Sequence, residues 1–144
     1  MNSTDIKPEQ LRSIKCLKHI ADADCGALLE FLELEICPQN QVLFEEGAAG
    51  DCMYMILSGQ VRVFSRRKGH EKTLKDLGPG DVFGDIAMFN HTPRLASVQA
   101  TTEAKLLKLT EAALEKFAAK YPNREVAFLR ALSLSLTQIY ADFH

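Results

Sequence analysis

The sequence predicts an α+β fold, in which a β-sandwich or β-roll is flanked by helices at both ends of the chain. Near both ends, apolar residues recur at three- and four-residue spacing, which is typical of helices. Between residues 33 and 109, short runs of β-branched and aromatic residues are instead separated by glycine, proline and asparagine. With 144 residues, 47% of them hydrophobic, the chain has the length and apolar content of one globular domain.

The N-terminal segment, residues 1–32, is predicted to contain two short helices. The sequence Asp22-Ala-Asp24 is expected to end the first helix and to cap the second. The apolar residues that carry the helical spacing are Leu11, Ile14, Leu17, Leu28, Leu29 and Leu32.

The middle segment, residues 33–109, is predicted to consist of strands. The candidate strands are separated by turn signals such as Ser58-Gly59, Lys68-Gly69 and Gly78-Pro-Gly80. Several short strands with closely spaced turns favour a sandwich or a roll. The candidate strands are Phe31–Cys37, Gln41–Glu45, Cys52–Leu57, Gln60–Ser65, Lys72–Leu77, Ala96–Thr101 and Ala104–Leu109.

The C-terminal segment, residues 110–144, is predicted to form two helices. Thr110 is a good N-cap for the first of them. Tyr121-Pro122-Asn123 is expected to end this helix, and the last helix is predicted from about Asn123 to Tyr140. Residues 131–141 carry no charge, so this stretch is expected either to cover the β-structure or to meet a partner.

Composition and charge argue against several classes of function. The chain has 17 lysines and arginines against 19 aspartates and glutamates, a net charge of -2, so a surface that follows nucleic-acid phosphates is not expected. No apolar run has membrane-spanning length, and the N-terminus lacks the apolar core of a signal peptide, which predicts a cytoplasmic protein with no membrane segment. The four cysteines form no CxxC pair and are expected to be reduced and mostly buried. The four histidines form no HxH or HExxH motif, so no metal site is expected.

Residues 84–98 are the segment in which a ligand-binding site is predicted. Gly84 ends a predicted strand, a short helical turn follows at once, and a proline-arginine loop leads into the next strand. This order directs the free amides around Ile86 and Ala87 into a concavity and places Arg94 on its opposite lip. Free amides, one arginine and surrounding apolar strands suit a single phosphate on a small ligand.

This segment resembles the phosphate-binding cassette of the cyclic nucleotide-binding domains found in catabolite-activator-type bacterial regulators, protein kinase A regulatory subunits and cyclic-nucleotide-gated channels. The family pattern is Phe-Gly-Glu, an aliphatic residue and Ala, a short loop, then Pro-Arg, a small residue, Ala, Ser or Thr, and Val. Residues 83–98 are FGDIAMFNHTPRLASV, without a gap. EEGAAGDCMYMILSGQVRV and LGPGDVFG, which precede and enter this segment, are similar to the glycine turns and hairpin of the family. The resemblance covers roughly residues 10–130.

The resemblance implies an antiparallel β-roll, double-stranded and jelly-roll-like, within a single domain over residues 1–144. Its parts would be N-terminal helices at 1–32, the roll at 33–109 and C-terminal helices at 110–144, with the cassette at 83–98. It also implies a regulatory module without catalytic residues or a metal, whose ligand is a cyclic nucleotide. Members that favour cGMP tend to have a threonine directly after the arginine, whereas this chain has Leu95, so cAMP is expected before cGMP.

The resemblance also implies a role for individual residues. Arg94 would pair with the exocyclic phosphate, and amides of the residues after it and of the helical turn would complete the anion site. Gly84 would leave room for the sugar, and Ala96 would stand where the family has a small residue against the phosphate. The implied ligand-binding residues are Gly84, Asp85, Ile86, Ala87, Arg94, Leu95 and Ala96.

Two departures from the family pattern leave an alternative open. Asp85 replaces the glutamate that accepts a hydrogen bond from the ribose 2′-hydroxyl, and it is one methylene shorter, so it would need a shift or a bridging water to reach. Asp85 as a cap of the short helix would explain the residue equally well. Leu95 is larger than the usual residue and could crowd the pocket. The alternative is a degenerate fold that acts as a dimerisation or docking domain without nucleotide.

The C-terminal helices are expected to relay binding. Family members often close the pocket with a side chain from the last helix, for which Phe128, Leu129 and Leu132 are candidates, although core packing would explain all three. Tyr54 and Phe83 are expected to be structural. The charge-free stretch would contact a second copy or a partner protein. The 35 residues from 110 to 144 are too few for these helices plus a winged helix-turn-helix, so no direct DNA binding is expected. An alternative cupin-type enzyme would need a cluster of metal ligands, which the scattered histidines do not supply.

Overall fold

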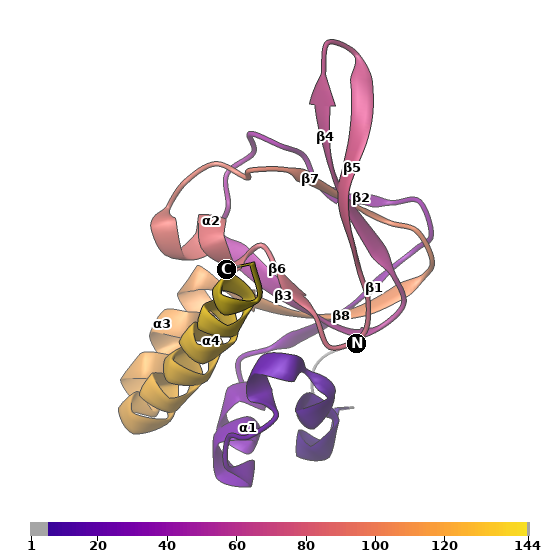
Figure 1. Ribbon diagram of the computed structural model, residues 1–144. Coiled ribbons are helices and arrows are strands. Elements are labelled where there is room, and N and C mark those ends of the chain that lie inside the picture. The colour runs from indigo at the N-terminus through magenta and orange to yellow at the C-terminus, as the bar shows by residue number, and fades with distance from the viewer. Residues whose placement is uncertain (1–5, 144) are drawn as a thin grey trace.

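Two antiparallel four-stranded sheets form a β-roll, and helices cover one side of it (Figure 1). The computed structural model describes the backbone of residues 6–143 and the side chains of residues 6–134. The strand orders are β1-β8-β3-β6 and β2-β7-β4-β5. The strands are β1 (Glu33–Cys37), β2 (Val42–Phe44), β3 (Cys52–Ser58), β4 (Val61–Arg67), β5 (His70–Leu77), β6 (Val82–Phe83), β7 (Ser97–Ala100) and β8 (Ala104–Thr110). The helices are η2 (Pro8–Ser13), η3 (Lys15–Leu17), α1 (Asp22–Leu29), α2 (Asp85–Asn90), α3 (Glu111–Lys120) and α4 (Pro122–Phe143).

Strand β3 contributes to two hydrophobic cores. Its side chains point alternately to opposite faces of the sheet, as in any strand. Cys52, Tyr54 and Ile56 face the core between the two sheets. Met53 and Met55 face a second core, which the sheet shares with the helices. Both faces of β3 are therefore buried, and the roll and the helical layer are joined along it.

The predicted α+β fold with a β-roll is confirmed, and all seven candidate strands are present with shifted ends. An eighth strand, β6, has only two residues, Val82 and Phe83, and pairs with β3 opposite Met55 and Tyr54. The sequence predicted a strand that ends at Gly84 but not its bounds, because two residues show no alternation. Its pairing with β3 places the start of the cassette segment beside the start of β3.

The helical ends differ from the predictions in three details. The first N-terminal segment is a pair of short 3₁₀ helices, η2 and η3, instead of one helix. Asp22 is the first residue of α1, whose N-cap is Ala21, so the prediction that the Asp22–Asp24 sequence caps the helix is wrong. Pro122 begins α4 instead of lying before it, because the fixed φ of proline suits the first helical position.

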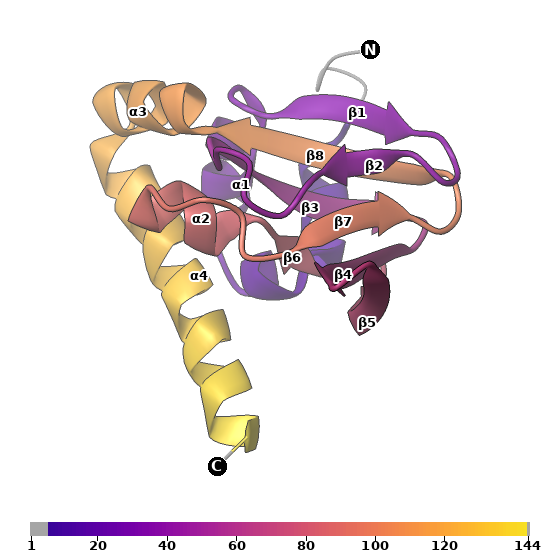
Figure 2. The ribbon, with the colours of Figure 1, turned by 90° about the horizontal axis from the view of Figure 1, so that it is seen from above.

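Helix α3 begins as expected, and α4 ends at Phe143, beyond the predicted end at Tyr140. Thr110 caps α3, since its side-chain oxygen accepts a hydrogen bond from the amide of Ala113 at 3.0 Å. Figure 2 shows that the C-terminal part of α4 extends past α2 and away from the sheets. Among residues 6–143, no helix is both long and apolar enough to cross a membrane.

Candidate functional site

The cassette segment and three strands enclose a cavity of about 230 Å³. Its lining residues are Phe44, Val63, Phe83, Gly84, Asp85, Ile86, Ala87, Arg94, Leu95, Ala96 and Val98. The structure therefore brings all seven predicted site residues together around one space. The ligand contacts assigned to them stay predictions.

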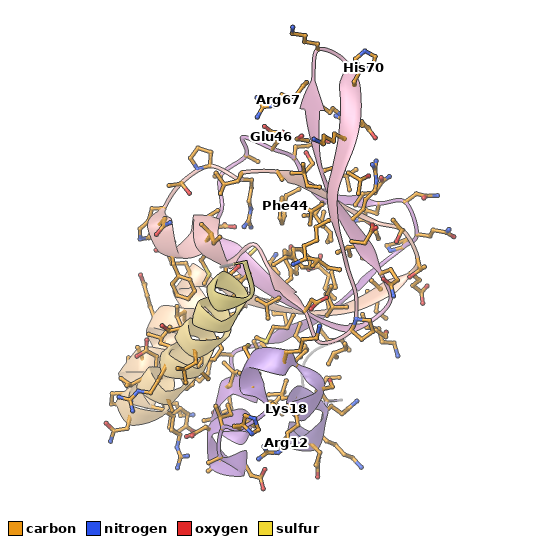
Figure 3. All side chains as sticks on the ribbon, in the orientation of Figure 1. Arg12, Lys18, Phe44, Glu46, Arg67 and His70 are labelled. Atoms are coloured by element: carbon orange, nitrogen blue, oxygen red, sulfur yellow. The ribbon has the colours of Figure 1, made fainter. Side chains whose placement is uncertain are left out.

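Arg94 lies in the wall of this cavity. The residue is only 4% exposed. Its Nη1 donates a hydrogen bond to the carbonyl of Gly84 at 2.8 Å, and its Nη2 donates to the carbonyl of Cys52 at 2.8 Å. The centre of the guanidinium lies 4.0 Å from the centre of the Phe44 ring, a cation–π contact. Figure 3 shows Phe44 inside the roll, below the hairpin that carries Arg67 and His70.

The charge of Arg94 is not neutralised by a carboxylate. Within residues 6–134, whose side chains are described, Arg94 forms no ion pair. Its Nε is buried and has no hydrogen-bond partner there. A buried cation is destabilising unless an anion or enough acceptors surround it. The site is therefore electrostatically suited to an anionic ligand.

The backbone of Arg94 is fixed by the glycine turn at residues 47–50. The amide of Arg94 donates to the carbonyl of Ala48 at 2.8 Å, and the amide of Gly47 donates to the carbonyl of Arg94 at 2.9 Å. A Cβ on Gly50 would lie 2.5 Å from the Cβ of Ala87, so only glycine lets this turn approach α2. These contacts hold the turn against both α2 and the Arg94 loop.

Gly84 is required by its conformation and by Arg94. Its φ is +81°, in the left-handed region that favours glycine. A Cβ here would lie 2.9 Å from Nη1 of Arg94 and 3.2 Å from the carbonyl oxygen of Cys52. The sequence predicted that the missing Cβ leaves room for a sugar. In the structure, the space is used by the arginine side chain.

Backbone amides of the Arg94 loop provide further donors beside the cavity. Leu95 and Ala96 both line it, and within the described chain their amides have no backbone hydrogen bond. Leu95 is 69% exposed and also lines the cavity, so the expectation that it crowds a ligand stays a prediction. The loop thus offers two amides near a buried guanidinium.

Asp85 is the second charged residue in the cavity wall, 8% exposed. Burial raises the pKa of its carboxyl group, while the amides of Asp85 itself and of Ile86 act in the opposite direction. Asp85 is the first residue of α2 and follows the N-cap, which is Gly84, so the alternative in which Asp85 is the N-cap residue is wrong. Its carboxylate nevertheless lies close to the first amides of α2. The Ile86 amide, expected to face the ligand, is therefore near this carboxylate.

Sequence reasoning missed four residues that build the site. Phe44, Val63 and Val98 line the cavity from β2, β4 and β7, and Cys52 contacts Arg94. Strand alternation marks such residues as inward-facing, but only the assembled sheets show which of them reach the cavity. Tyr54 is buried in the core, as expected. Phe83 stacks on Tyr54 with ring centres 5.1 Å apart, in keeping with a structural role, and it also lines the cavity.

The part of α4 whose side chains are described, residues 122–134, does not close this cavity. No α4 residue with a described side chain lines it. Phe128 and Leu132 are buried in the core between sheet and helices, and Leu129 packs against that core, as the alternative of core packing expects. Of the charge-free stretch at 131–141, the side chains of residues 135–141 lie outside those that the structure describes.

A second and larger cavity, of about 1060 Å³, lies beside the first turn of α2. Its wall includes Cys16 of η3, Leu77 of β5, and Ala131 and Leu134 of α4. Asp85 and Ile86 line both cavities. The first turn of α2 is thus a common wall between the Arg94 site and the space beside the C-terminal helix.

Within the described residues, no three histidine, cysteine or acidic side chains are grouped so that they could hold a metal ion. All four cysteines are free and buried, as the sequence predicts. Burial raises the pKa of Cys16 to about 12 and raises that of Cys25 and Cys37. These three cysteines therefore stay protonated at neutral pH.

The chain is similar to one known protein family in sequence and to solved structures in fold. The sequence profile of one family, described as "Cyclic nucleotide-binding domain", matches residues 34–121, more than half of the chain. A cyclic nucleotide-binding domain from Methylobacillus flagellatus is a structural neighbour with a TM-score of 0.82 and 25% identity, covering 94% of this chain and 77% of the other.

Two curated relatives are similar in sequence. The chain is 33% identical over 112 residues to the CRP-like cAMP-activated global transcriptional regulator of Mycobacterium tuberculosis, which covers 77% of this chain and 50% of the regulator. It is 34% identical over 106 residues to the cAMP-dependent protein kinase regulatory subunit of Eremothecium gossypii, covering 74% of this chain and 22% of the subunit. The chain spans half the length, or less, of these relatives.

Proposed function

The chain belongs to the cyclic nucleotide-binding domain family, and from this premise we propose that it is a regulatory module that binds cAMP in the cavity beside Arg94. A regulatory role, and not a catalytic one, is in keeping with the relatives named above, which are a transcriptional regulator and a kinase regulatory subunit. No DNA binding is proposed for these residues, whose net charge is -2.

The observation that carries this proposal is the unpaired charge of Arg94. A cyclic phosphate bears one negative charge, which would compensate the buried guanidinium. Its exocyclic oxygens can accept hydrogen bonds from Nε of Arg94 and from the amides of Leu95 and Ala96, which have no backbone partner within the described chain. A charge-assisted hydrogen bond in a buried site is among the strongest polar contacts that a protein offers.

The rest of the nucleotide would meet the other walls. The carboxylate of Asp85 would accept a hydrogen bond from the ribose 2′-hydroxyl, directly or through a water. Phe44, Val63 and Val98 would pack on apolar parts of the ligand. Leu95 offers no hydroxyl to guanine, which favours adenine.

Titration calorimetry with the purified protein tests the proposal. We expect cAMP to bind more tightly than cGMP, and more tightly than 2′-deoxy-cAMP, because the deoxy analogue lacks the hydroxyl that Asp85 would contact. Arg94→Ala should abolish measurable binding, a loss of more than about 30-fold, since truncating a buried charged anchor costs about 2 kcal/mol or more.

The matched control is Arg67→Ala, which removes an exposed arginine of the β4–β5 hairpin and should leave the affinity unchanged. If the unmodified protein gives neither heat nor a thermal shift with millimolar cAMP, the proposal fails. That result would favour the alternative of a dimerisation or docking domain without nucleotide.

The route from the ligand to a partner would run through α2. Because Asp85 and Ile86 line both cavities, a ligand that moves Asp85 also changes the wall of the space beside α4. We propose that α4 reports this change to a second copy of the chain or to a partner protein. Such a relay works only if the ligand binds one arrangement of the helix more tightly than the other.

A further inference from the structure

Cys52 contacts Arg94 through its side chain as well as through its backbone carbonyl. It is the first residue of β3, and its side chain, 4% exposed, faces the core between the sheets. Nη2 of Arg94 donates to the Cys52 carbonyl at 2.8 Å and also to Sγ of the same residue at 3.3 Å. The thiol is therefore a side-chain acceptor for the guanidinium.

The thiol is itself held in place from within the roll. Tyr54, two residues along β3, faces the same core. Burial raises the pKa of Tyr54, with Cys52 and Glu35 as further causes, so the phenol stays protonated beside the thiol. The buried thiol of Cys52 therefore interacts with both the phenol and the guanidinium.

The thiol adds a third acceptor to the two carbonyls that bind the guanidinium of Arg94. A guanidinium has five N–H donors in one plane. Three are used, by the carbonyls of Gly84 and Cys52 and by Sγ of Cys52, while Nε has no partner within the described residues. Three acceptors and the Phe44 ring define the plane of the group more tightly than two carbonyls would. The orientation that results leaves Nε–H uncommitted.

We propose that Cys52 is a positioning residue for the ligand phosphate: its Sγ holds the Arg94 guanidinium in the orientation that keeps Nε–H free for an exocyclic phosphate oxygen. This rests on the proposed function, because it assigns a role within the same site. Cys52 touches no ligand in this role and acts through Arg94.

Three variants test the role by titration calorimetry with cAMP. Cys52→Ala removes Sγ but keeps the carbonyl contact, and we expect it to weaken binding about fivefold to tenfold, the loss of about one ordinary hydrogen bond, because sulfur is a weak acceptor. Cys52→Ser supplies a hydroxyl acceptor of similar size and should restore affinity to within about twofold. The control Cys37→Ala truncates another buried thiol of the same core, which has no contact with Arg94, and should bind as the unmodified protein does.

A second readout separates positioning from loss of stability. The two phosphorothioate diastereomers of cAMP place sulfur on one or the other exocyclic position, so the ratio of their affinities reports where the guanidinium meets the phosphate. Cys52→Ala should change this ratio, whereas Cys37→Ala should leave it unchanged. If Cys52→Ala does not fold, Cys52→Val keeps the bulk without an acceptor and is expected to show the same two effects.

The outcomes are distinguishable. If the unmodified protein does not bind cAMP, the proposed function fails and the role of Cys52 fails with it. If it binds cAMP but Cys52→Ala leaves the affinity and the diastereomer ratio unchanged, or tightens binding, the role of Cys52 alone is overturned. Equal losses in Cys52→Ala and Cys37→Ala would overturn it too, because they would show a general effect of core truncation.

Discussion

Two buried charges, Arg94 and Asp85, lie in the wall of one cavity and are not paired with each other. Each is less stable in the folded protein than it would be with a partner of opposite charge. For Asp85 the effect depends on pH, because burial raises the pKa of its carboxyl group above that in the unfolded chain. The protonated form is favoured in the folded state.

Asp85→Asn should therefore stabilise the protein at neutral pH. With a raised folded pKa, the stabilising contribution of Asp85 is fully present below the unfolded pKa of about 4 and is lost as the pH rises through the folded value. We expect the variant to melt at a higher temperature than the unmodified protein at pH 7, and the difference to shrink toward about pH 4. Thermal unfolding followed by circular dichroism measures this.

Asp76→Asn is the matched control, since Asp76 is exposed on β5. It should show a smaller pH-dependent difference than Asp85→Asn. A melting temperature for Asp85→Asn that is equal to or lower than that of the unmodified protein at pH 7 would contradict the prediction.

At this scale, the family resemblance predicted which residues gather around the cavity, but not how Arg94 is held. The Pro-Arg sequence identifies the residue. Its inward orientation depends on the carbonyls of Gly84 and Cys52, which lie on neighbouring strand ends. No local sequence pattern shows that pairing.

Among the elements, the strands were predictable because alternation and turn residues are local properties. For β6 only the end at Gly84 was predictable, since two residues are too few to show alternation and their pairing with β3 is not a local property. The start of α3 was predicted for a local reason, the side-chain cap of Thr110. A capping bond is therefore the feature of the C-terminal helices that is easiest to test.

Thr110→Ala should destabilise the protein by about 1 kcal/mol, because it leaves the amide of Ala113 without its partner. For a domain of this size we expect the melting temperature to fall by about 2–4 °C. Thr101→Ala, at an exposed position in the turn before β8, is the control and should have little effect. Equal melting temperatures for the two variants would show that the cap contributes nothing.

For the molecule as a whole, ligand binding and stability should be coupled, because cAMP is expected to bind the folded chain and not the unfolded one. At a concentration of about 100 times the Kd, cAMP would add about 2.7 kcal/mol. The melting temperature should then rise by roughly 5–10 °C. Arg94→Ala should show no rise at the same concentration in a thermal-shift assay, whereas a rise of equal size would contradict the assignment of the site.

The burial of both faces of β3 has a consequence for how the molecule unfolds. Met53 and Met55 are buried against the helices on one face of the strand, and Tyr54 and Ile56 are buried inside the roll on the other. Loss of either layer would expose these buried side chains to solvent, so β3 would not be stable in a fragment that lacked one of the two layers. The chain should consequently unfold in one cooperative transition. The Arg94 cavity and helix α4 pack against opposite faces of this one strand.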